Sequence, residues 1–164
     1  MSEVAAQTTA SFRAPGPEVQ AQRDQLREAM VALEAALARP STGRADGWRG
    51  ELEPALRRLR EALERHHEVT EGEDGLLTQI VTAAPHLGHA AQVVREEHPS
   101  IDEHQRRLSE AVEALGAVAP SDVASRADTV RRLGNELLGM LVRHRQRGVE
   151  LTYQAFATDL GSGE

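Results

Sequence analysis

The sequence predicts an all-α protein, an up-down-up-down antiparallel four-helix bundle. Its composition is rich in Ala, Leu, Arg and Glu, and only 2% of the 164 residues are aromatic, which favours helix. Four segments carry apolar residues every three or four positions, and short connections with Pro or Gly join them. This length is most simply one domain. We expect an N-terminal tail at 1–16, the bundle at 17–158 and a C-terminal tail at 159–164.

The first helix is predicted to begin at Pro17. The residues before it have no apolar periodicity, and proline suits the first position of a helix. The helix is expected to stop at Pro40, where STGRADG forms a loop. Its apolar stripe consists of Val19, Leu26, Met30, Leu33 and Leu37.

The second helix is predicted to begin near Trp48. Its stripe leads directly into the adjacent pair His66 and His67. Gly72 and Gly75 are expected to bend or interrupt it, with one more apolar turn before Pro85. The stripe consists of Leu52, Leu56, Leu59 and Leu63, and the last turn of Leu76, Leu77 and Ile80.

The third helix has the most regular stripe, and His98 lies in the middle of it. Pro99 follows directly, and Ser100 with Glu103 forms a capping-box pattern. We therefore expect either a kink at this point or two helices that share one axis. The stripe consists of Leu87, Ala91, Val94, His98, Ile101, Gln105, Leu108, Val112 and Leu115.

The fourth helix is predicted to start at Pro120 and Ser121. His144 occupies a position on its apolar stripe, as His98 does on the third helix. The final DLGSGE is expected to fray. The stripe consists of Val130, Leu133, Leu137, Leu141, His144, Gly148, Leu151 and Ala155.

Composition excludes several classes of function. The net charge of −7 and the lack of a large arginine cluster argue against nucleic-acid binding. The absence of cysteine excludes disulfides, thiolate metal sites and a thiol nucleophile. No apolar run reaches the ~20 residues that span a bilayer, and the N-terminus does not read as a signal peptide. The sequence therefore predicts a cytoplasmic protein without a membrane role.

The histidines are expected to meet inside the bundle. His66 or His67 on the second helix, His98 on the third and His144 on the fourth can lie at a similar depth. Imidazole combined with carboxylate suits iron, manganese or zinc, and Glu71 lies one helical turn after His67. The alternative is that each histidine is a core residue satisfied by ordinary hydrogen bonds.

Three segments resemble hemerythrin-like proteins of the HHE cation-binding group: RHHEVTEGEDGLL, REEHPSI and LVRHRQRGVELTYQAF. The similarity covers residues from about 17 to 158. It implies a four-helix bundle that holds non-haem iron between histidines and carboxylates, with dioxygen or peroxide as a second partner. Family roles include oxygen binding, iron or oxygen sensing and stress responses.

The resemblance also implies a ligand set. His67, Glu68 and Glu71 match the family's motif on the second helix, and His98 and His144 match the ligands of the next two. His66 is the alternative to His67: the apolar stripe favours His66 as the inward residue. The carboxylate four residues later favours His67, which we prefer.

Two ligand positions of the family pattern are missing. The first helix offers Gln22 or Arg23, with Gln25 nearby, in place of a histidine, and Gly148 stands where a carboxylate is expected. About four donors remain, fewer than two irons require. We expect a metal-binding protein in iron, oxygen or redox sensing or storage, holding one or two irons. The alternative is a metal-free helical interaction module, and a diiron oxidase or peroxidase-like enzyme ranks last.

Overall fold

The computed structural model describes residues 15–161, and this part of the chain is helical, without strands. The prediction of an all-α protein is confirmed, and no helix among these residues combines the length and apolarity needed to cross a membrane. The four long helices are α1 (Pro17–Ala38), α2 (Ala45–Glu71), α4 (Gly88–Glu113) and α5 (Val123–Gly161). The shorter elements are α3 (Leu76–Ala83) and the 3₁₀ turns η1 (Pro85–Leu87), η2 (Ala114–Ala117) and η3 (Pro120–Asp122).

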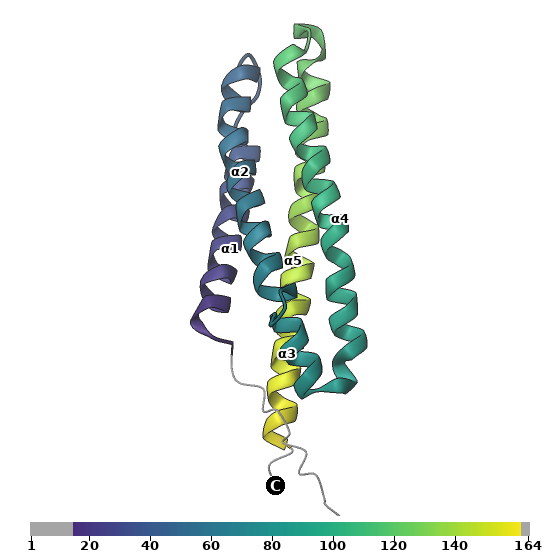
Figure 1. Cartoon of the computed structure of the whole chain (residues 1–164). Helices are drawn as coiled ribbons and strands as arrows, with labels where there is room; N and C mark the ends of the chain where they lie inside the picture. The colour runs from purple at the N-terminus through teal and green to yellow at the C-terminus, as the bar shows by residue number, and fades with distance from the viewer. Residues whose placement is uncertain (1–14, 162–164) are drawn as a thin grey trace, which may run out of the picture.

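The long helices pack as two pairs that join into one bundle. α1 packs most extensively on α2, and α4 on α5, and the pairs meet through α2 with α4 and α1 with α5. Figure 1 shows the α1–α2 and α4–α5 connections at the upper end of the view. The short helix α3 lies at the opposite, lower end, where it contacts α2, α4 and α5.

The observed helix boundaries lie close to the predicted ones. Pro17 is the first residue of α1, as predicted. α2 begins at Ala45, three residues earlier than expected. Trp48 in its first turn is fully buried, and its Nε1 donates to the carbonyl of Ala36 at 2.8 Å. α5 continues to Gly161, past the expected end at 158. The predicted tails otherwise fall largely at 1–14 and 162–164, outside the described residues.

Helix α4 passes through Pro99 without a break, so the alternative of two separate helices is wrong. Proline removes one backbone hydrogen bond from a helix interior. On either side of it, His98 and Ile101 are buried, at 3% and 1% exposure. Packing of the apolar face therefore keeps the helix continuous across the proline.

The predicted interruption between Gly72 and Gly75 is confirmed. α2 ends at Glu71, and the N–H of Gly72 donates to the carbonyl of Glu68 at 3.1 Å. A Cβ atom on Gly75 would lie 2.6 Å from the carbonyl oxygen of Thr70, so the chain folds back too closely for a side chain there. This turn leaves Glu71 at the end of α2, facing α4.

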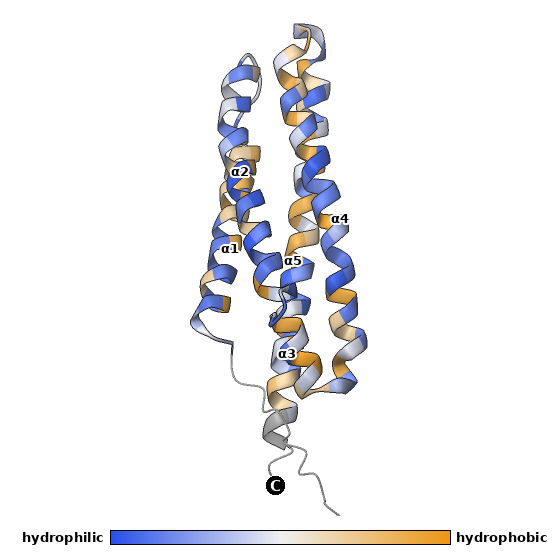
Figure 2. Ribbon diagram, in the orientation of Figure 1, coloured by the Kyte–Doolittle hydropathy of each residue, from blue (hydrophilic) through white to orange (hydrophobic). Residues whose placement is uncertain are grey.

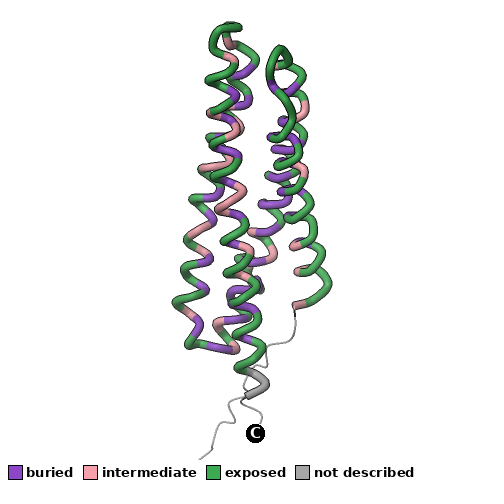
Figure 3. The backbone as a smooth tube through the Cα atoms, turned by 180° about the vertical axis from the view of Figure 1, so that it is seen from behind, coloured by how far each residue is buried: buried purple, intermediate pink, exposed green. Residues whose placement is uncertain are grey.

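The predicted apolar stripes form the core. All their residues are buried except Val19, Gln105 and Gly148, which are intermediate. Figure 2 shows the apolar residues recurring along each helix, and Figure 3 shows the buried positions on the inward faces. Each of the four long helices therefore packs into the core the face that the sequence periodicity indicates.

The core has two apolar clusters. The upper cluster joins α1, α2, α4 and α5, and the lower one joins α3 with the start of α4 and the end of α5. On α4, His98 falls between Val94 of the lower cluster and Ile101 of the upper one. On α5, His144 falls between Leu141 and Leu151 in the same way. A buried polar layer therefore separates the two clusters.

Candidate metal centre

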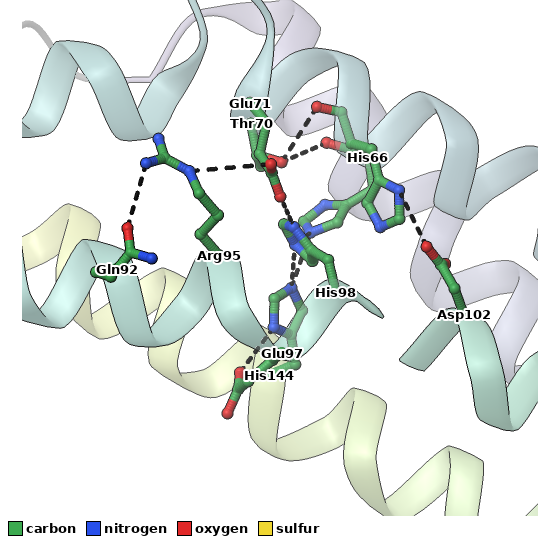
Figure 4. A network of polar contacts seen from close by, with 10 residues as sticks. His66, Thr70, Glu71, Gln92, Arg95, Glu97, His98, Asp102 and His144 are labelled. Atoms are coloured by element: carbon green, nitrogen blue, oxygen red, sulfur yellow. Dashed lines mark hydrogen bonds and ion pairs between the residues drawn. The ribbon is translucent and has the colours of Figure 1, made fainter. Parts of the chain in front are cut away.

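Three helices each place one histidine in this polar layer: His66 from α2, His98 from α4 and His144 from α5 (Figure 4). Their exposed fractions are 8%, 3% and 2%. The Nε2 atom of His66 lies 2.9 Å from that of His144 and 3.2 Å from that of His98. The Nε2 atoms of His98 and His144 are 3.1 Å apart. Three ring nitrogens therefore converge on one point.

Carboxylates fix the orientation of two of these rings. The Nδ1–H of His98 donates to the carboxylate of Glu71, and the Nδ1–H of His144 donates to Glu97 at 2.8 Å. A carboxylate only accepts, so each ring carries its proton on Nδ1. Figure 4 shows both contacts beside the three rings. Both Nε2 atoms therefore present lone pairs to the centre.

Each of these carboxylates also contacts an arginine. The Nε of Arg95 lies 3.9 Å from Oε2 of Glu71, and Arg147 forms an ion pair with Glu97. Two lines of polar contacts, His98–Glu71–Arg95 and His144–Glu97–Arg147, thus run from the buried centre toward the surface. The arginines thus place positive charge next to the two carboxylates that accept from the histidines.

The three histidines are uncharged at neutral pH. Burial, followed by repulsion from the neighbouring histidines, lowers the pKa of His66 to about 2. Burial also lowers the pKa of His98 to about 4, although its hydrogen bond to Glu71 opposes the shift. The pKa of His144 is lowered to about 4, again mainly by burial. The layer therefore holds neutral imidazoles rather than imidazolium ions.

Neutral rings in this arrangement cannot all form hydrogen bonds with one another. Lone pairs of His98 and His144 face each other at 3.1 Å, with no proton between them. His66 has a single N–H, which can serve one of its two Nε2 contacts well. Hydrogen bonding within the cluster is thus incomplete, and a cation at its centre would replace lone-pair repulsion with three attractive contacts.

The structure brings His66, and not the preferred His67, into the convergent group. Helical phase explains this, because the buried positions Leu63, His66 and Thr70 continue the apolar stripe of α2. The side chain of His67 is 27% exposed, and its Nδ1 lies 3.8 Å from Oδ2 of Asp102. Its ring centroid is 4.4 Å from that of His98.

The carboxylates predicted on α2 behave differently from each other. Glu71 reaches the site, but through Nδ1 of His98 and not as the helical partner of His67. Glu68 is exposed and forms an ion pair with Arg65 at 3.0 Å, away from the cluster. Sequence reasoning missed Glu97 as the acceptor for His144. Its position next to His98 in the sequence places it near the site, but not specifically against α5.

Helix α1 supplies no ring to the cluster, and Gly148 leaves a space beside it. Gln22 is 3% exposed, and its Nε2 has no hydrogen-bond partner among the described residues. Arg23 donates from Nη2 to Oγ1 of Thr152 at 2.9 Å. A Cβ atom on Gly148 would have nothing within 4 Å. The positions that the sequence marked as missing ligands therefore adjoin an opening.

Comparisons of the chain with protein family models, with curated proteins and with solved structures gave no match. Inference about function therefore rests on the chemistry of the histidine cluster and its surroundings.

Proposed function

We propose that this chain is a hemerythrin-like protein that binds non-haem iron between His66, His98 and His144, and acts in iron, oxygen or redox sensing or in storage. The observation that supports this most directly is the convergence of three neutral Nε2 atoms, two of them on rings oriented by Glu71 and Glu97. A carboxylate on the outer nitrogen of a ligating histidine fixes its tautomer and increases its basicity.

The spacing of the nitrogens supports one ion with open coordination positions. With metal–nitrogen bonds of about 2.1 Å, two nitrogens lie about 3.0 Å apart at right angles and about 3.4 Å apart at tetrahedral angles. The observed separations of 2.9, 3.1 and 3.2 Å fall in the range expected for three nitrogens on one ion. His66, His98 and His144 would hold an iron or manganese ion, which could in turn bind water, dioxygen or peroxide.

The hemerythrin-like, up-down-up-down order is part of the same proposal. It is supported by the common end at which the α1–α2 and α4–α5 connections lie in Figure 1. α1 contributes Gln22 where the family pattern has a histidine, and α5 has Gly148 where it has a carboxylate. These two differences favour a single ion over the two irons of the family plan.

The test is anaerobic loading of metal-free protein with Fe(II), followed by removal of free metal. We expect about one iron per chain and a rise in melting temperature, because a ligand that binds only the folded state stabilises it. His98→Ala and His144→Ala should lose both effects, and the exposed His86→Ala serves as the control. Iron content below about a tenth of an equivalent in the unchanged protein would overturn the proposal.

A metal-free interaction module is the second candidate, favoured by an exposed apolar stripe on α5. Val142, Val149 and Tyr153 are 53%, 52% and 71% exposed, and Phe156 is 37% exposed. Spacings of seven, four and three residues place them on one face of the helix. Under this reading, Val149→Asp with Tyr153→Asp abolishes association with a partner or a second copy in sedimentation experiments, and the His→Ala variants still associate.

A further inference from the structure

A cavity of about 50 Å³ adjoins the histidine cluster on the side of α1 and α5. Polar groups line it from α1, α2 and α5, and apolar side chains line it from α3 and α4. The residues that matter here are Gln22, Arg23, His66, Ile80, Arg145 and Gly148.

Several polar groups of this cavity lack a hydrogen-bond partner or a counter-charge. The Nε2 of Gln22 and the Nδ1 of His66 are buried and have no hydrogen-bond partner among the described residues. The one hydrogen bond between Arg23 and a described residue goes to the hydroxyl of Thr152, and no ion pair joins Arg23 or Arg145 to a described carboxylate. Aspartate and glutamate are absent from the described residues that line the cavity. The wall is therefore electropositive and lacks a counter-charge.

Burial and like charge in this cavity disfavour the ionised form of Arg23. Burial, followed by the charge of Arg145, lowers the pKa of its guanidinium. An anion between the two arginines would offset both effects, because opposite charge favours the ionised guanidinium. Arginine also presents parallel N–H groups that match the two oxygens of a carboxylate.

The size and the apolar wall restrict the anion. A water molecule requires at least about 10–15 Å³ of such space, so this cavity suits about three or four non-hydrogen atoms. Leu76, Leu77 and Ile80 of α3 form an apolar surface against which a methyl group can pack. A strongly hydrated dianion such as sulfate would fit this wall poorly.

We propose that the cavity binds a small monocarboxylate of the acetate class, with its oxygens toward Arg23 and Gln22 and its methyl group toward α3. In this position the carboxylate also accepts from Nδ1–H of His66, as Glu71 and Glu97 accept from the other two rings. That last contact rests on the proposed metal site, because a metal on Nε2 requires the proton on Nδ1. The arginine and amide donors are present without metal.

Gly148 keeps the cavity open. Its missing Cβ leaves space that any larger residue would occupy, and it lies one turn after His144 on α5. The bound carboxylate would therefore stand where a side chain at position 148 would place its own.

The first test uses metal-free protein and sodium acetate, with sodium chloride at equal ionic strength as the reference. Isothermal titration should show saturable binding of about one acetate per chain. Arg23→Gln should weaken it at least about tenfold, since it removes the charge-assisted contact. Arg57→Gln, at an exposed arginine on α2, is the matched control and should leave binding unchanged. Absence of saturable binding, or equal binding in all three proteins, would overturn the proposal.

The second test uses position 148. Gly148→Glu should abolish acetate binding and raise the melting temperature, because its carboxylate would reach the same donors. Gly148→Gln fills a similar volume without charge, so it should block acetate without an equal rise. Equal melting temperatures for the two variants would contradict the electropositive cavity.

The experiments distinguish failure of the metal-binding proposal from failure of the carboxylate-binding proposal. Acetate binding without iron uptake would leave the carboxylate site intact and remove the proposed metal function. Iron uptake without acetate binding, in either the loaded or the metal-free protein, would overturn the carboxylate site alone.

Discussion

The carboxylates of Glu71 and Glu97 determine how the rings of His98 and His144 face the centre of the site. Each occupies the outer nitrogen of its ring and so directs the other nitrogen inward. Loss of such a contact typically costs 10–100-fold in metal affinity. The two residues thus matter without touching the metal themselves.

We predict that Glu71→Gln and Glu97→Gln each weaken Fe(II) binding by about 10–100-fold and leave the fold intact. The glutamine keeps the shape of the side chain but loses the charge that holds the histidine proton. Glu68→Gln is the control, because Glu68 is exposed and paired with Arg65. Competition with a metal-sensitive dye measures the affinity; equal affinities in all three variants would contradict the proposed orientation.

A second prediction separates His66 from His67. His66→Ala should abolish tight Fe(II) binding, because it removes one of three converging nitrogens. His67→Ala should change the affinity by less than about tenfold, since its ring lies beside His98 and outside the convergent group. Equilibrium dialysis against Fe(II) distinguishes them, and the reverse order would identify His67 as the ligand.

The site residues also show which features of the site could be predicted from the sequence and which could not. Periodicity indicated that His66 points inward, because burial follows helical phase. The preference for His67 came from its carboxylate one turn later, and that pairing does not occur. The choice of Glu97 as the partner of His144 depends on the relative rotation and shift of α4 and α5, which no periodicity within one helix specifies.

At the scale of elements, the turn from α2 to α3 positions Glu71 at a helix end. Gly75 allows this turn, since a Cβ atom there would meet the Thr70 carbonyl at 2.6 Å and the Gly72 backbone at 2.8 Å. Its φ of −65° is ordinary, so the requirement is one of space and not of backbone conformation.

We predict that Gly75→Ala destabilises the metal-free protein by about 1–3 kcal/mol, because backbone atoms must move to admit the methyl group. Gly50→Ala is the matched control within α2: it is exposed and a Cβ there has nothing within 4 Å. It should stabilise by up to about 1 kcal/mol through helix propensity. Urea unfolding followed by circular dichroism compares them, and a loss of stability in both would contradict the steric argument.

The helices themselves were largely predictable. The four apolar stripes and the break near Gly72 have local causes, and residues such as Leu33, Leu59 and Leu137 are fully buried as expected. Pro99 did not separate two helices, because the buried residues around it stabilise α4 more than one lost hydrogen bond destabilises it. The sequence around a proline does not show how much tertiary packing stabilises the helix.

At the scale of the whole molecule, the buried histidine layer makes stability depend on pH. The folded pKa values of His66, His98 and His144 lie at about 2, 4 and 4, below the ordinary value of 6.5. Between about pH 6.5 and 4 the unfolded chain therefore binds more protons than the folded one, and the free energy of unfolding decreases as the pH falls. Glu71 and Glu97 face these rings and moderate the effect.

We predict that metal-free protein loses stability from pH 7 to pH 5, by about 1 kcal/mol or more for each buried histidine. Urea unfolding at the two pH values measures the loss. His144→Leu should reduce the difference, and the exposed His86→Ala should not. A stability that rises on acidification would show that the rings are charged in the folded state.

The polar layer between two apolar clusters also has a consequence for rates. The histidines are 2–8% exposed, and the cavity beside them has room for only about four non-hydrogen atoms, so a hydrated ion reaches them only when helices separate near the layer. The lower end closes with the eight-residue α3, the shortest α-helix among the described residues. At high metal concentration the loading rate should therefore stop rising and equal the rate of this opening. A protein with such kinetics loads and releases slowly, which suits a store or a sensor that averages over time better than a rapid carrier.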